Sequence, residues 1–215
     1  MTSTQDCLLN AAEALFAEKG YAATSLRSIA ARADVNLAAT HYHFGSKEGL
    51  LAAIVERRVE PINQARLAAL DALEAEGNFT VESILQAFLQ PLIHSEEIEY
   101  LPTIIGRIDS EPHVVMKPLL EKQFGEMARR FLNAISVALP DIPQQELKWR
   151  FHFLVGAMLK TLTHPTPLGL GTTEDSYEIK FQRLIQFAIP GFSAPVPATL
   201  KTKGALKTKG SGETK

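Results

Sequence analysis

The chain has 215 residues, of which 46% are hydrophobic, and it carries a net charge of −2 at pH 7 and a single cysteine. This length can bury the core of one large or two small domains. The lone Cys7 excludes an internal disulfide and fits a reducing cytoplasm, and the near-neutral charge argues against a nonspecific coat on nucleic acid. The amino terminus lacks the basic and apolar regions of a signal peptide, and no later run of about 18 residues is free of charge, Pro and Gly. We therefore expect neither secretion nor a membrane span.

The amino-terminal 50 residues predict three helices. The first runs from about Thr4 to Lys19, with Cys7 on its apolar side as a small core residue, and Gly20 ends it as a cap. The second has one apolar face with the spacing i, i+3, i+4, i+7 and can be capped by Thr24 or Ser25; its apolar residues are Leu26, Ile29, Ala30 and Ala33.

A tight turn and a short third helix follow. Asp34 tolerates the left-handed backbone that such a turn needs, and Asn36 can cap the next helix, Leu37 to Phe44, with its side-chain oxygen. A helix of about two turns is not stable alone, so its neighbours must hold it. Its outward residues are then free for another role. This order of helix, turn and short helix is typical of a helix-turn-helix unit that reads DNA.

The rest of the chain also predicts helices. Ser46 begins a fourth helix, which Pro61 is expected to end or kink. No alternating strand pattern occurs, so the predicted fold class is all-α. Several prolines interrupt the helices, and such breaks often leave space inside a bundle. Further helices are expected near residues 62–76, 80–93, 96–109, 114–138, 144–163 and 174–189.

The last segment, residues 193–215, differs in composition. It has five lysines and one glutamate, a net charge of +4, which leaves −6 for residues 1–192. It repeats Leu-Lys-Thr-Lys-Gly and has almost nothing to bury, so we expect a disordered basic tail. The tail could bind anionic lipid or DNA, but a flexible solubilising tail is the simpler interpretation.

The residues from Thr24 through Ile29-Ala30, Ala33, Val35, Tyr42-His43-Phe44 and Lys47 to Leu50 resemble, in their spacing, the DNA-binding domain of the TetR family of bacterial transcriptional repressors. The resemblance covers roughly residues 5–57. It implies a TetR-type fold with a helix-turn-helix head at 1–50, a ligand-binding and dimerisation domain at 51–192, and the tail. Two further segments, Asn36 to Ala39 and Trp149 to Phe153, resemble more narrowly the fatty-acid-responsive, PsrA-like repressors.

The resemblance also implies a DNA-binding surface. Residues in the positions of Arg27, Leu37, Ala38, Ala39 and His41 face base edges or adjoining backbone in the family, and those matching Ser25, Tyr42 and Lys47 usually touch phosphate; Asn36 starts the same helix. Arg27 can hold guanine with two hydrogen bonds, while Leu37 and the alanines offer only apolar contacts. This chain departs from the frequent tyrosine at His41, threonine at Ala39 and glycine at Asp34. Core packing is an alternative for Tyr42 and the expectation for His43, and a solvated side chain is the alternative for Lys47.

The regulatory half offers polar and aromatic groups within apolar helices, which suits a ligand pocket, although each taken alone is better explained as a core or surface residue. Arg107 and His113 are the strongest candidates to bind a carboxylate or a thioester-linked phosphate. The other candidates are His94, Tyr100, Phe124, Phe151, His152 and Phe153.

In the family, the last two helices pair with their copies in a second subunit. Two heads must also sit about 34–36 Å apart to enter successive major grooves, which favours a homodimer on a palindromic operator. Gly156, in mid-helix, fits a close helix crossing at this interface, with packing inside one subunit as the alternative.

No motif of a zinc or di-iron enzyme or a dinucleotide loop occurs, and we expect no catalysis, cofactor or metal. The sequence therefore predicts a cytoplasmic, ligand-responsive repressor that an apolar effector such as a fatty acid or acyl-CoA releases from DNA. The alternatives are a drug-sensing regulator, acting as a repressor or as an activator, and a helical binding protein with a structural head.

Overall fold

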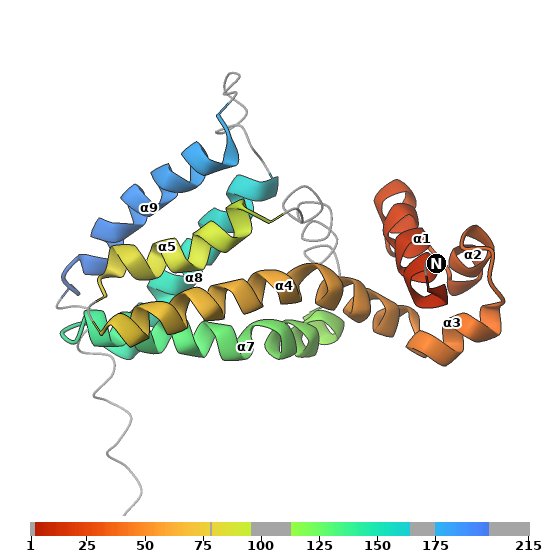
Figure 1. Ribbon diagram of the computed structural model, residues 1–215, viewed down its shortest axis with the longest axis horizontal. Helices are drawn as coiled ribbons and strands as arrows, with labels where there is room; N and C mark the ends of the chain where they lie inside the picture. Colours follow the sequence, from red (N-terminus) through yellow and green to blue (C-terminus); the bar gives the residue numbers. More distant parts are fainter. Residues whose placement is uncertain (1–2, 78, 96–112, 164–174, 198–215) are drawn as a thin grey trace, which may run out of the picture.

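The computed structural model describes residues 3–77, 79–95, 113–163 and 175–197. These residues form eight helices and no strand, which confirms the all-α prediction. The helix expected at 96–109, and the tail from residue 198 onward, lie outside the described residues. Figure 1 shows a small head of three helices at one end of a long fourth helix, and a larger helical body around the rest of that helix.

The head consists of α1 (Thr4–Lys19), α2 (Leu26–Arg32) and α3 (Leu37–Phe44). Side chains and one glycine cap them as the sequence predicted. Ser25 caps α2 in a reciprocal pair with Ser28, Asn36 caps α3, and Gly20 ends α1 with a φ of 86°. Leu8, Ile29 and Leu50 are fully buried between these helices, but Cys7 is only half-buried. The cysteine is thus at the edge of the core rather than inside it.

The fourth helix, α4 (Lys47–Glu76), runs without interruption through Pro61. The expectation that Pro61 would end it was wrong, and one helix replaces the two that were predicted. A proline leaves the carbonyl four residues earlier without its helical donor. Here Pro61 lies on the exposed side, where water can satisfy that carbonyl, while Val59 and Ile62 beside it are buried. Packing of these neighbours holds the helix together.

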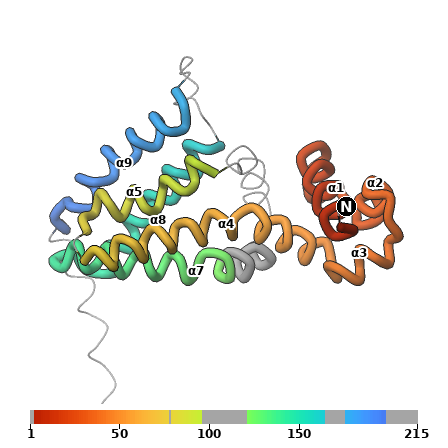
Figure 2. The backbone as a smooth tube through the Cα atoms, in the orientation of Figure 1, coloured from red at the N-terminus to blue at the C-terminus, as the bar shows by residue number. Residues whose placement is uncertain are grey.

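The body contains α5 (Val81–Ile93), α7 (His113–Ala138), α8 (Gln144–Thr163) and α9 (Tyr177–Ser193), packed around the carboxyl-terminal part of α4. In Figures 1 and 2, α7 runs beside α4, and α5 and α9 lie on the other side of α4. The centre is aromatic: the ring of Phe88 on α5 lies 5.2 Å from that of Phe131 and 5.1 Å from that of Phe151, between centroids.

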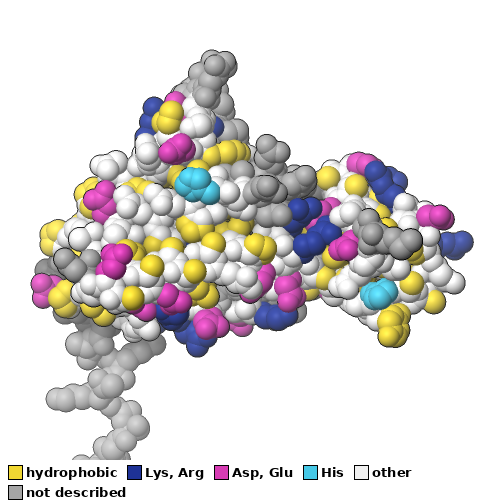
Figure 3. Space-filling model, viewed as in Figure 1, with side chains coloured by type: hydrophobic (Ala, Val, Ile, Leu, Met, Phe, Trp, Pro, Cys, Tyr) yellow, Lys and Arg dark blue, Asp and Glu magenta, His cyan; other side chains and the backbone are white. Residues whose placement is uncertain are grey.

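Two arginine clusters fix the packing at the ends of the body. Glu13 on α1 forms ion pairs with Arg57 at 2.7 Å and with Arg58 at 2.6 Å, and these tie the head to α4. Figure 3 shows charged side chains of both signs gathered where the head meets the body. At the far end, Arg150 Nη1 on α8 donates to the carbonyls of Phe192 and Ala194 and so closes the end of α9.

Candidate nucleic-acid interface and regulatory core

The turn between α2 and α3 has the geometry that its residues predicted. Asp34 has a φ of 55°, the only positive value of a non-glycine residue among those described. The side-chain oxygen of Asn36 accepts from the Ala38 amide at 2.9 Å, which fixes the first turn of α3. Val35 is half-buried against the core. The turn therefore holds α3 at a defined angle to α2.

One face of α3 is buried and the other is exposed. Thr40 is fully buried, whereas the Tyr42 side chain is 86% exposed, and His41 and Ala38 are exposed as well. Leu37 and Ala39 are half-exposed at its edges. Figure 3 shows hydrophobic and histidine side chains at the end of the head where α3 lies. The exposed face of α3 thus includes Tyr42, His41 and Ala38.

His43 is exposed, so its expected place in the core was wrong. Its ring makes an edge contact with the ring of Tyr42, at 5.3 Å between centroids. A single helix of two turns can bury only a narrow stripe, and Thr40 and half-buried Phe44 already form it.

His41 has a fixed ring position. Its Nδ1 lies 3.1 Å from the carbonyl oxygen of Gly45, which can only accept, so Nδ1 carries the proton. In the neutral ring Nε2 is then an acceptor. His41 can therefore replace a tyrosine as a polar group on this face.

Ser25 and Arg27 lie at the amino terminus of α2, and both are exposed. The Ser25 oxygen is engaged by the Ser28 amide, at 3.1 Å. Arg27 has no hydrogen bond or ion pair to any residue that the structure describes, so its guanidinium is available to a ligand. Arg27 therefore lies exposed at the amino-terminal end of α2, beside the Ser25 cap.

Lys47, at the first position of α4, is bound inside the protein rather than solvated. Its ammonium donates to the carbonyls of Tyr21 and Thr24, both at 3.0 Å, and lies 4.2 Å from the centre of the Tyr21 ring. An ammonium has three N–H groups, so one remains for a phosphate. The sequence did not indicate this contact, because Tyr21 and Thr24 are more than 20 positions away.

The candidates for a ligand pocket are only partly brought together. Phe151 is buried beside Phe88, and Phe124 is half-buried against the core. His152 is exposed and its ring contacts that of Trp149, so it does not join Phe151. Tyr100 and Arg107 lie outside the described residues, as does the side chain of His113.

Arg66 on α4, which the sequence analysis missed, lies at the centre of the body and is 3% exposed. Its Nε donates to the Phe88 carbonyl at 2.7 Å, Nη1 to Asn63 Oδ1 at 3.3 Å and Nη2 to Met158 Sδ at 3.5 Å. Burial lowers the pKa of Arg66 to about 9, so it still carries its charge at neutral pH. An arginine between Ile62 and Leu70, on the apolar stripe of α4, was the available signal.

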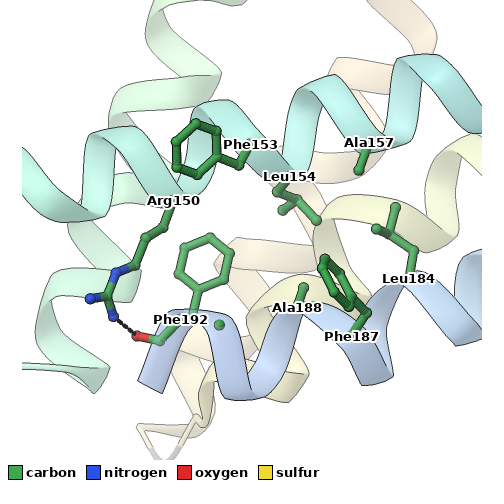
Figure 4. A pocket seen from close by; sticks show the side chains of 9 residues that line it. Arg150, Phe153, Leu154, Ala157, Leu184, Phe187, Ala188 and Phe192 are labelled. Carbon is green, nitrogen blue, oxygen red and sulfur yellow. Dashed lines mark hydrogen bonds between the residues drawn. The ribbon is translucent and has the colours of Figure 1, made fainter. Parts of the chain in front are cut away.

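The outer faces of α8 and α9 carry exposed aromatic groups. Phe153 is 64% exposed and Phe187 76% exposed, and both line an apolar hollow of about 310 Å³ between these helices. Figure 4 shows the two rings on opposite helices, with Leu154 and Ala188 between them and Arg150 at one end. Gly156 is exposed on α8, and no atom lies within 4 Å of the position that its Cβ would take. Ordinary packing within one subunit therefore does not explain this glycine.

The described residues offer no group of three or more histidine, cysteine or carboxylate side chains that could hold a metal. No helix among them is long and apolar enough to cross a membrane.

A three-helix head with an ordered turn and an exposed short helix, joined to a separate helical body, is typical of the helix-turn-helix class of proteins. Residues 8–54 match the family described as bacterial regulatory proteins, tetR family, and residues 82–194 match the tetracyclin repressor-like, C-terminal domain. The chain belongs to the TetR family and is a DNA-binding transcriptional regulator, not an enzyme.

Curated relatives agree with this assignment. The chain is 31% identical over 105 residues to the probable HTH-type transcriptional regulator YttP of Bacillus subtilis, covering 49% of this chain and 50% of that protein. It is 32% identical over 108 residues to the transposon Tn10 TetC protein of Escherichia coli, covering 48% and 54%. The match thus spans about half the length of these relatives.

Solved structures share the whole fold. A fatty acid degradation regulator, FadR of Bacillus halodurans, has a TM-score of 0.67 at 12% identity, covering 89% of this chain and 97% of that one. The SmeT–triclosan complex has a TM-score of 0.61 at 22% identity, covering 92% and 96%. These identities show the fold alone, so the PsrA-like resemblance stays a prediction.

Proposed function

We propose that this regulator is a homodimeric repressor that binds a palindromic operator in the cytoplasm and leaves it when a mainly apolar effector binds the body. The observation that carries the proposal is the separation of two surfaces. A head with an exposed short helix lies at one end of α4, and a body with an aromatic centre and an exposed aromatic face lies around the other.

The DNA-binding part rests on the exposed face of the head. Tyr42, His41 and Ala38 project from α3, while Arg27 and Ser25 lie at the start of α2. Asn36, Leu37 and Ala39 complete the start of α3, and Lys47 keeps one N–H free beside it. Arg27 is the one group in this set suited to a bidentate contact with guanine, so shape and deformability of the operator must supply part of the selectivity.

The dimer rests on the outer faces of α8 and α9. Contiguous exposed aromatic groups in a soluble protein mark an interaction surface. Trp149, Phe153 and Phe187 are each more than half exposed. Gly156, which follows Trp149 and Phe153 on α8 and precedes Ala157, leaves room for a helix of a second copy. Such an interface would also set the distance between the two heads.

The effector is proposed to be a fatty acid or its acyl thioester. Support comes from the aromatic centre around Phe88 and from the aliphatic side chains that surround it. Burial of apolar surface at about 25 cal/mol per Å² gives a long acyl chain micromolar affinity, even after the entropy lost when the acyl chain is ordered. Affinity should then rise with chain length until the site is full.

The test uses the full-length protein on a duplex from its own promoter, with fluorescence anisotropy as the readout. Saturated acids and their CoA thioesters of increasing length are titrated against the complex. We expect binding that weakens with salt, and release that strengthens with chain length. Absence of salt-dependent binding to any promoter duplex would make the head structural. Release by a planar or cationic drug, with none by acyl chains, would replace the fatty-acid proposal with a drug-sensing regulator.

A further inference from the structure

Arg66 has an unusual position for a charged side chain. It is 3% exposed and lies among four helices, because Phe88 is on α5, Met158 on α8, and Asn63 bonds in turn to the Gln123 carbonyl on α7 at 2.8 Å. No carboxylate of the described residues pairs with it. Buried charges in proteins are almost always paired, because removing an ion from water is unfavourable.

The hydrogen bonds of Arg66 are also incomplete. A guanidinium has five N–H groups, and three are used, one of them on the thioether sulfur of Met158, which is a weak acceptor. One N–H on each terminal nitrogen has no acceptor in the described part of the chain. The two terminal nitrogens of one guanidinium can together donate to the two oxygens of a carboxylate.

A purely structural role does not require the charge. The Arg66 bond to the Phe88 carbonyl ties α4 to α5, but it does not replace the bond lost at Pro91, because the carbonyl that Pro91 leaves without a helical donor is that of Ala87. A neutral amide could donate the same bond without the penalty of a buried ion. The guanidinium lies 4.2 Å from the centre of the Phe88 ring. These apolar surroundings offer contacts to an apolar ligand but no counter-charge.

We propose that Arg66 anchors the anionic group of the effector, a carboxylate, and that the remainder of the ligand lies against the aromatic centre around Phe88. This inference rests on the proposed effector site in the body and names the residue that orients the ligand there. Arg66 takes the role for which the sequence suggested Arg107 and His113. With Arg66 as the anchor, the regulator senses acids in preference to neutral molecules of the same shape.

The test compares acids with matched neutral molecules. Full-length protein is titrated by calorimetry with dodecanoate and dodecanol, and with 2-naphthoate and 2-naphthamide. For at least one pair we expect the wild type to bind the acid roughly ten- to a hundredfold more tightly, the range for hydrogen bonds to a charged group. Arg66→Met should bring that ratio to about one, and Arg66→Lys should retain part of it. Arg129→Met, on the exposed side of α7, should leave the ratio unchanged.

The outcomes separate this inference from the proposed function. If the wild type shows no preference for either acid, or if Arg66→Met keeps the preference, Arg66 is not the anchor. If neither dodecyl compound binds and the naphthoate pair shows an Arg66-dependent preference, the anchor stands and the aliphatic effector fails. If dodecanoate and dodecanol bind equally and the naphthoate pair shows no Arg66-dependent preference, the aliphatic effector stands and the anchor fails. If Arg66→Met does not fold, the affinity ratios of acid to neutral molecule are compared between the wild type and Arg66→Lys, and a smaller ratio in Arg66→Lys supports the anchor while an unchanged ratio contradicts it.

Discussion

Lys47→Ala tests how the head is held and what it touches. The substitution removes two hydrogen bonds of 3.0 Å to the carbonyls of Tyr21 and Thr24 and the contact over the Tyr21 ring. Hydrogen bonds from a charged donor contribute about 1.5–3 kcal/mol when buried, and an exposed cation–π contact contributes about 0.5–1 kcal/mol. Because Lys47 is half-buried, water replaces part of the hydrogen bonding that the substitution removes. We expect a loss of about 1.5–3 kcal/mol in the free energy of unfolding.

The same variant tests the remaining N–H. If this N–H group of Lys47 binds a phosphate in the wild type, the slope of log affinity against log salt should be about one unit smaller in Lys47→Ala, equally for all duplexes. Thermal unfolding gives the stability, and anisotropy at several KCl concentrations, well below the unfolding temperature, gives the slope. Lys19→Ala is the control, because Lys19 is exposed and makes no hydrogen bond to the described residues.

The two results can refute the reasoning separately. An unchanged unfolding free energy would show that the contacts with Tyr21 and Thr24 do not hold the head. Equal salt slopes for wild type and Lys47→Ala would remove the phosphate contact and leave Lys47 as a structural clamp only.

Three further substitutions probe other parts of the molecule. Arg27→Ala should cost about 1–3 kcal/mol of operator affinity and relax preference at one base pair; a uniform loss on all sequences in a base-substitution series would make Arg27 a phosphate contact. Gly156→Leu should weaken the dimer by about 1–3 kcal/mol through overpacking, and sedimentation showing a monomeric wild type or an unchanged variant would contradict this. Burial of Glu13 raises the pKa of its carboxyl, but hydrogen bonds from Arg58 and Arg57 outweigh this and lower the pKa below its usual value. Its stabilisation is therefore present above pH 4.5 and lost as pH falls through the lowered pKa of the folded state; Glu13→Gln should show a smaller loss of stability between pH 5 and pH 3, by urea unfolding.

Local features of the head could be predicted because short-range chemistry determines them. Asp34 in the left-handed region, the Asn36 cap and the Ser25 cap each depend on a side chain and backbone within three residues. The exposure of His43 and the clamp at Lys47 depend on how separate helices meet. A sequence pattern carries little information on such contacts, since many side chains could occupy the same place.

The body shows the same limit. Pro61 has a strong tendency to break a helix, but buried neighbours on the same helix overcome it here. Phe151 and His152 were both candidates for the ligand pocket as aromatic or polar groups within an apolar helix, whereas the helix turns one into the core and the other to the surface. Arg66 lies on the apolar stripe of α4, but arginines on helices are usually solvated, so the stripe alone does not establish its burial, and its buried partners do.

The unbroken α4 gives a physical route from effector to DNA. Lys47 and Arg66 lie 19 residues apart on it, about 28 Å at 1.5 Å per residue. The head cannot turn freely on this helix, because Glu13 binds Arg57 and Arg58 and Lys47 binds the turn before α2. A ligand that pairs with Arg66 would favour one tilt of α4 relative to α5, α7 and α8, and the head would follow. In a dimer this changes the distance between the two short helices, which must remain near 34–36 Å for both to enter the major groove. On the mechanism proposed, the ligand would shift this equilibrium by the difference between its affinities for the two tilts, so its contact with Arg66 would release the operator to the extent that it favours one of them.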